Sequence, residues 1–192
     1  VESNSMYIGN DPSSTTSTAE YNVAIGAAAL DAVTTADKTV AVGYNALSAN
    51  TTGYWNTAIG WNAMVNNTTG GENVALGQAS LDANTTGNSN VALGSYALSS
   101  NTTANINTGI GVGALRDNTT GSGNASVGAL ALLLNTTGTN NTALGYSAGD
   151  AMTTGSNNLL LGKSADASSA SASNQIVVGA SAVGHGDNIA VI

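Results

Sequence analysis

Apolar and polar residues alternate in short segments that recur along the whole chain. In residues 73–77, which read Asn-Val-Ala-Leu-Gly, two larger apolar side chains flank an alanine and a glycine ends the run. A period of two predicts a half-buried β-strand. The glycine that follows the apolar residue returns at every seventeenth position, ten times without an insertion. These glycines are Gly9, Gly26, Gly43, Gly60, Gly77, Gly94, Gly111, Gly128, Gly145, Gly162 and Gly179.

The rest of each unit carries a second apolar position and a turn. Four residues after the glycine the chain places Leu30, Leu47, Met64, Leu81, Leu98, Leu115 and Leu132. An Asn-Thr-Thr-Gly turn follows in five units, at residues 50–53, 67–70, 84–87, 118–121 and 135–138, and Asn and Gly accept the positive φ of tight corners. Seventeen residues are too few for a helical repeat, which needs about 33, but suffice for two short strands and two turns.

We therefore expect an all-β fold, a parallel β-solenoid of about eleven 17-residue coils, in which each strand bonds to its equivalents above and below. Stacking would also place the asparagines that precede the strands above one another, as an amide ladder. These are Asn22, Asn56, Asn73, Asn90, Asn107, Asn124, Asn141 and Asn158.

The pattern changes towards the C-terminus. The small position inside the strand motif becomes bulky at Leu160 and Val177, and the leucine column is interrupted at Gly149 and Asp166. The strand motif returns at residues 188–192, four residues earlier than the period predicts. We expect a single repeat array over residues 1–192, with a shortened last coil after residue 179, cut from a longer fibre.

Composition and charge exclude several classes of function. Charged residues make up 7% of the chain, its net charge is −8 with three basic residues, and cysteine is absent. We therefore expect no nucleic-acid partner, because a phosphate-binding surface needs clustered basic residues. No apolar run approaches the roughly 18 residues that span a bilayer, so we expect no membrane insertion.

Catalytic and metal-binding patterns are also weak. His185 is the only histidine, and its neighbour Asp187 implies no geometry between a base and a nucleophile. No Asp recurs in every coil as a calcium-binding β-roll would require. The sequence predicts no enzyme, no cofactor and no metal site.

The strand motif at residues 22–26, 73–77 and 90–94 resembles the head repeat of trimeric autotransporter adhesins, which is a left-handed parallel β-roll of three chains. The longer unit at residues 56–70 is more similar to repeats in tail fibres of bacteriophages and in related bacterial surface proteins. The adhesin coil is usually shorter, so its atomic details do not transfer. The resemblance implies a homotrimeric structural shaft or head segment at the extracellular surface or on a virion. Such a segment acts as a rigid spacer and as an attachment surface for a host glycan or receptor.

The alternation suggests which side of the strand would meet the other chains. If Val, Ile and Leu face the protomer interior, the small residues between them form a flat outer surface that another sheet can approach closely. We therefore expect the inter-chain contact to be lined by Ala24, Ala41, Ala58, Ala75, Ala92 and Ala143.

Two alternative functions are binding functions. A column of threonines, Thr51, Thr68, Thr85, Thr102 and Thr119, is the candidate ice face of an ice-binding solenoid. Adjacent threonines in a strand point to opposite sides, so only one column would face ice.

Tyr44 and Trp61 occupy the same position in adjacent coils, with Trp55 in the turn between them. Flat aromatic faces pack on sugars, which makes these three residues candidate glycan contacts.

Overall fold

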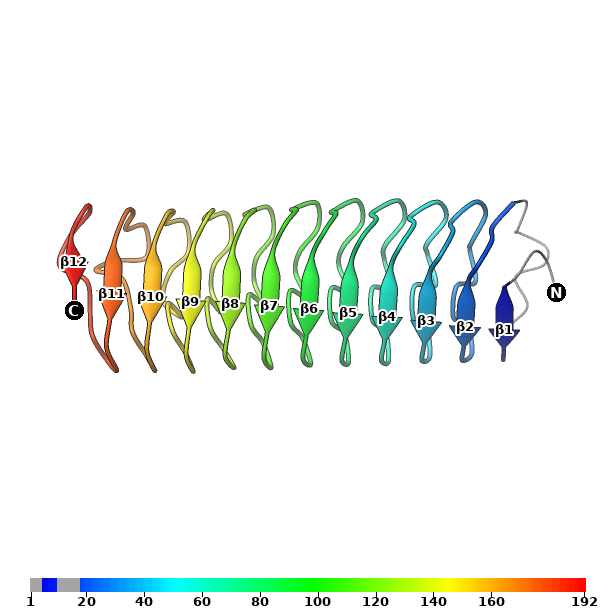
Figure 1. Ribbon diagram of the computed structural model, residues 1–192, viewed down its shortest axis with the longest axis horizontal. Coiled ribbons are helices and arrows are strands. Elements are labelled where there is room, and N and C mark those ends of the chain that lie inside the picture. The colour runs from blue at the N-terminus through cyan, green and yellow to red at the C-terminus, as the bar shows by residue number, and fades with distance from the viewer. Residues whose placement is uncertain (1–4, 10–17) are drawn as a thin grey trace.

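The computed structural model describes residues 5–9 and 18–192, and in them the chain forms one continuous stack of coils (Figure 1). Twelve short strands lie side by side in chain order in a single parallel sheet, and the described residues contain no helix. The strands are β1 (Met6–Ile8), β2 (Val23–Ile25), β3 (Val40–Val42), β4 (Thr57–Ile59), β5 (Val74–Leu76), β6 (Val91–Leu93), β7 (Thr108–Ile110), β8 (Ala125–Val127), β9 (Thr142–Leu144), β10 (Leu159–Leu161), β11 (Ile176–Val178) and β12 (Ala190–Val191).

The register of the sheet confirms the predicted period. From β1 to β11 each strand pairs with the next at the full offset of the repeat, from Met6 with Val23 at one end to Leu159 with Ile176 at the other. The step to β12 is smaller, because Ile176 pairs with Ala190. The last coil is thus shorter by three residues (17 − 14), and the predicted shortening of four is wrong. Ile189, and not Asn188, supplies the carbonyl that bonds the β11 amide.

The recurring glycine ends each strand in a conformation that only glycine fits. Gly77 has a φ of +137°, and a Cβ added to it would lie 2.6 Å from the carbonyl carbon of Gly94 in the next coil. L-residues avoid such φ values, and backbone atoms at this distance cannot move aside within a stacked sheet. The glycine column therefore sets both the corner and the close spacing of the coils.

Each coil contains one strand, and the prediction of two is wrong. The leucine column lies in a run of turns, and its members Leu30 to Leu132 have φ values between 49 and 53°. A left-handed residue costs about 1–2 kcal/mol, whereas burying a leucine contributes about 1.5–3 kcal/mol. Because these side chains are fully buried, burial outweighs the backbone strain. The sharp corners that close a small coil leave no room for a second extended segment.

Amide ladders fill the polar part of the interior. Asn73 donates from its backbone N–H and from Nδ2 to Asn56 Oδ1, at 3.0 and 3.2 Å, and Asn90 repeats both bonds to Asn73. The predicted asparagine ladder is confirmed. A second buried ladder, which was not predicted from the repeat, joins Asn67 Nδ2 to Asn50 Oδ1 at 2.8 Å and continues through later coils. Buried amides that are paired in this way hold neighbouring coils in register.

Candidate interaction surfaces

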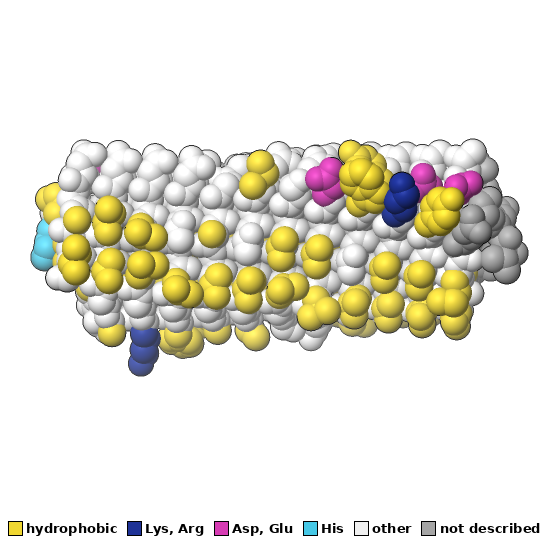
Figure 2. Space-filling model, in the orientation of Figure 1, with side chains coloured by type: hydrophobic (Ala, Val, Ile, Leu, Met, Phe, Trp, Pro, Cys, Tyr) yellow, Lys and Arg dark blue, Asp and Glu magenta, His cyan; other side chains and the backbone are white. Residues whose placement is uncertain are grey.

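The outer side of the sheet is apolar along the length of the stack. In β5, Val74 and Leu76 are exposed while Ala75 between them is fully buried. In β2 to β11 the middle residue is likewise buried and its two neighbours are half-buried or exposed; these neighbours are apolar except for Thr57, Thr108 and Thr142. Figure 2 shows rows of hydrophobic side chains running along this face, with charged groups only near its margins. We call the outward first and third residues of strands β1–β11 the apolar strip. Contiguous exposed apolar surface of this kind marks interaction sites in soluble proteins.

The prediction that the alanines line an inter-chain contact is wrong. They point into the coil, and a single chain already removes them from solvent, so a second chain cannot reach them. The six residues are Ala24, Ala41, Ala58, Ala75, Ala92 and Ala143, each 0–2% exposed.

The physical reason is the narrow interior of the coil. In β7 the inward position is Gly109, and a Cβ added there would lie 3.4 Å from Leu98 Cγ and 3.5 Å from Leu98 Cδ1. The leucine column therefore fills the space behind the sheet and leaves room only for a small side chain. The valine, isoleucine and leucine side chains of the strands consequently project outwards.

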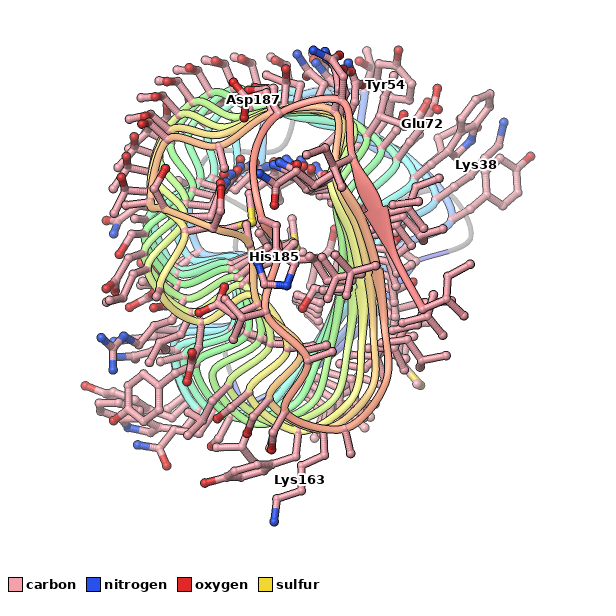
Figure 3. All side chains as sticks on the ribbon, turned by 90° about the vertical axis from the view of Figure 1, so that its left-hand side faces the viewer. Lys38, Tyr54, Glu72, Lys163, His185 and Asp187 are labelled. Carbon is pink, nitrogen blue, oxygen red and sulfur yellow. The ribbon has the colours of Figure 1, made fainter. Side chains whose placement is uncertain are left out.

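The structure separates the three predicted glycan contacts. Trp55 precedes β4, whereas Trp61 follows it and Tyr44 follows β3. Viewed along the stack, Lys38, which shares the column of Trp55, projects at one corner of the sheet, and Lys163, which shares the column of Tyr44 and Trp61, projects at another (Figure 3). The sheet lies between these corners, so Trp55 does not join the other two aromatic residues.

Trp55 instead belongs to a different cluster. Its ring meets Tyr54 in a T-shaped pair, with centroids 5.2 Å apart and planes at 84°. Lys38 Nζ lies 5.6 Å from the centroid of the Trp55 ring, a cation–π distance. Figure 3 shows Tyr54, Glu72 and Lys38 projecting at the same corner. Alignment of the chain by its period could have found Lys38, because it lies one coil before Trp55 in the same column.

The threonine pairs divide between a bonded and an exposed column. The predicted ice-face residues are half-buried, and their hydroxyls donate to carbonyls of the next coil, as Thr51 does to Thr68 O at 3.1 Å and Thr85 to Thr102 O at 3.1 Å. The exposed column consists of the second member of each pair. Its residues are Thr35, Thr52, Thr69, Thr86, Thr103, Thr120, Thr137 and Thr154.

Titratable side chains are scattered. His185 is exposed, and Asp187 accepts a hydrogen bond from the Ser173 backbone N–H at 2.8 Å. Burial raises the pKa of Asp82 and of Asp166 above the ordinary value, and the charge of Asp150 raises the pKa of Asp166 further.

Within residues 5–9 and 18–192, no three acidic, histidine or cysteine side chains gather in a group that could hold a metal ion. The same residues include no helix long and apolar enough to cross a membrane.

These features define a parallel β-solenoid repeat protein with one flat apolar face. No protein-family model matches the chain, and no curated protein and no solved structure is significantly similar to it.

Proposed function

We propose that this chain is a structural shaft or head segment of a fibrous surface protein, either a bacteriophage tail fibre or a bacterial adhesin. It would act on a virion or at the extracellular surface as a rigid spacer that also serves for attachment. The resemblance of the repeat supports this assignment, and the role requires no catalytic residue, metal or cofactor. The constant register from β1 to β11 supports the spacer role, because bonding between every pair of neighbouring coils resists bending.

The apolar strip is the observation that carries the proposal. Twelve strands at about 4.8 Å make a rod of roughly 50 Å, and the strip follows it from β1 to β11. Full burial of one valine, leucine or isoleucine side chain contributes about 1.5–3 kcal/mol. Several coils together therefore supply enough driving force for chains to associate side by side. The number of three chains comes from the resemblance to trimeric fibres.

The oligomeric state tests the proposal. Sedimentation or light scattering of the 192-residue chain should give three times the chain mass of 18.7 kDa. The double variant Leu76→Glu/Leu93→Glu should dissociate into monomers that keep their β-sheet circular dichroism, because it would bury unpaired charges between chains. The matched control Gln78→Glu/Ser95→Glu adds the same charges in the same two coils outside the strip, and should stay trimeric. A wild-type chain that is monomeric at high concentration would contradict the proposal.

Ice binding is a second candidate, and the exposed threonine column favours it. Eight successive coils each present one threonine to solvent, a regular spacing of hydroxyl and methyl groups. The test is thermal hysteresis. Activity that disappears in Thr86→Val/Thr103→Val and persists in Thr85→Val/Thr102→Val would support this function and assign it to the exposed column. Absence of hysteresis in the wild-type chain would exclude it.

A further inference from the structure

A third hydrogen-bonded ladder lies at the corner that precedes the strands. Eleven residues after most of the recurring glycines, the backbone N–H donates to a side-chain oxygen of the residue that pairs with it in the next coil. Gly71 N donates to Asn88 Oδ1 at 2.8 Å, Asn88 N to Asn105 Oδ1 at 2.7 Å, and Asn105 N to Ser122 Oγ at 3.1 Å. Glu20 N bonds Asp37 Oδ1 in the same way at 2.7 Å. The ladder therefore ties successive coils together at this corner.

The ladder has a single missing bond at Ser122, where Thr139 does not accept, and two successive missing bonds at Tyr54 and Gly71. Tyr54 follows Asp37 in the column, and the only polar side-chain atom of Tyr54 is at the far end of its ring. Gly71 comes next and offers no side chain to the Tyr54 N–H. The backbone N–H groups of Asp37 and Tyr54 thus lack the ladder bond. The net contribution of one hydrogen bond to the free energy of unfolding is about 0.5–1.5 kcal/mol, so the missing bonds lower the stability of the chain.

The interruption creates a surface for an aromatic ring. A Cβ added to Gly71 would lie 3.1 Å from Tyr54 O, 3.4 Å from Tyr54 Cζ and 3.5 Å from Tyr54 Cε1, so the Tyr54 ring lies directly against Gly71. Gly71 is the only glycine among the described residues of this column, which elsewhere contains Glu20, Asp37, Asn88, Asn105, Ser122, Thr139, Ser156 and Ser173. The aromatic ring therefore lies beside the position of this column that has no side chain.

Three further side chains complete the platform. Trp55 stands edge-to-face against Tyr54, Lys38 lies over the Trp55 ring, and Glu72 follows in the next coil, where its Oε2 accepts a bond from Ser89 Oγ at 3.1 Å. Both rings are about half exposed, at 47% for Tyr54 and 52% for Trp55. We call Lys38, Tyr54, Trp55 and Glu72 the aromatic platform. It offers fixed apolar ring surfaces with one cation and one carboxylate beside them.

We propose that the aromatic platform binds a neutral polysaccharide. The C–H face of a hexose packs on an exposed aromatic ring, while the Lys38 ammonium donates to sugar hydroxyls and the Glu72 carboxylate accepts from them. Anionic glycans are disfavoured, because Glu20, Asp37 and Glu72 outnumber Lys38 at this corner and the chain carries a net charge of −8. Tyr21 shares the column of Trp55 two coils away, roughly 9.6 Å along the rod, so the surface suits a linear chain of sugars.

This inference rests on the attachment role in the proposed function and names the ligand class for it, because a rigid spacer alone needs neither exposed rings nor a gap in a ladder. The test is a glycan array followed by titration of the strongest neutral glycan. Trp55→Ala should weaken binding at least about tenfold. Trp61→Ala is the matched control: Trp61 is 51% exposed, lies in the same coil at another corner, and should bind as the wild-type chain does.

The variant Tyr54→Asn distinguishes a binding role of Tyr54 from a merely structural one. Asparagine at this position can accept the Asp37 N–H and restore one rung of the ladder. The variant should therefore have a higher melting temperature than the wild-type chain and yet lose glycan binding. In addition, Trp61→Phe leaves Trp55 as the only tryptophan, and its fluorescence should change on titration with the glycan.

Several outcomes would overturn the glycan site. They are a wild-type chain that binds no neutral glycan, equal binding by the Trp55 and Trp61 variants, or a Tyr54→Asn variant that melts at a lower temperature. Sedimentation of the same samples separates this proposal from the shaft function. If Trp55→Ala dissociates the oligomer, the platform is part of a chain interface and the glycan proposal is wrong, whereas loss of binding by an intact trimer supports it.

Discussion

The Leu160 side chain occupies the space beside Gly149. A Cβ added to Gly149 would lie 2.6 Å from Leu160 Cδ1 and 2.9 Å from Leu132 Cδ2. One coil earlier the large and the small residue are exchanged: Leu132 is in the leucine column, and Ala143 is the inward residue of the strand. The two positions share one interior space, and the chain fills it from either wall of the coil.

This relationship predicts how the two positions combine on substitution. Leu160→Ala alone should leave a cavity and lower the free energy of unfolding by about 2–5 kcal/mol. Gly149→Leu alone should be destabilising because the new side chain meets Leu160. The double variant should recover most of the loss, since Gly149 has a φ of +65°, close to that of the leucines in its column. Denaturant unfolding of all four proteins measures the coupling, and simple additivity would show that the two positions do not share a space.

The period of the sequence was sufficient to predict the stacked coils, the register and one asparagine ladder. It did not identify the inward side of the strand. Alternation shows that two faces differ, but it does not show which of them meets the core, and the expectation that larger apolar residues are buried gave the wrong side. The exchange of bulk between Gly149 and Leu160 was a signal in the sequence that the small strand position and the leucine column share the interior.

The aromatic platform was predicted only in part. Trp55 was predicted as a glycan contact, and its partner Tyr54 directly precedes it in the chain. Lys38 lies one full repeat earlier, and only the stacking of the coils brings it to Trp55. Tyr44 and Trp61 were grouped with Trp55 because they are near it in sequence, although a strand separates them. The columns of the repeat, compared position by position, expose the departure from the Asp, Asn and Ser pattern at Tyr54 and Gly71.

The buried asparagine ladder should be costly to break. Asn90 is fully buried; its Oδ1 accepts from Asn107 N at 3.0 Å, and its Nδ2 donates to Ala104 O at 2.9 Å. Asn90→Ala leaves the Asn107 N–H without an acceptor, so we expect a loss of about 1–3 kcal/mol in the free energy of unfolding. The matched variant Asn66→Ala removes an exposed bond to Asp82 O and should cost under about 1 kcal/mol. Equal losses in the two variants would contradict a structural role of the ladder.

The half-buried Asp166 should make stability depend on pH. Desolvation raises the pKa of its carboxyl above the ordinary 3.8, the Ala167 N–H opposes this shift, and the charge of Asp150 adds to it. The folded chain then holds this proton more tightly than the unfolded chain does. The resulting stabilisation is fully present below pH 3.8 and is lost as the pH rises through the folded-state pKa.

Replacement of Asp166 by Asn tests this dependence, because the amide keeps an acceptor for the Ala167 N–H and cannot ionise. Relative to the wild-type chain, Asp166→Asn should be more stable at pH 7, and the difference should shrink as the pH falls towards 3.8. Asp150→Asn removes the neighbouring charge, lowers the pKa of Asp166, and should move the wild-type loss of stability to lower pH. Urea unfolding at pH 4 to 7 measures both effects. A stability difference between Asp166→Asn and the wild-type chain that stays constant with pH would show that this carboxyl titrates alike in the folded and unfolded chains.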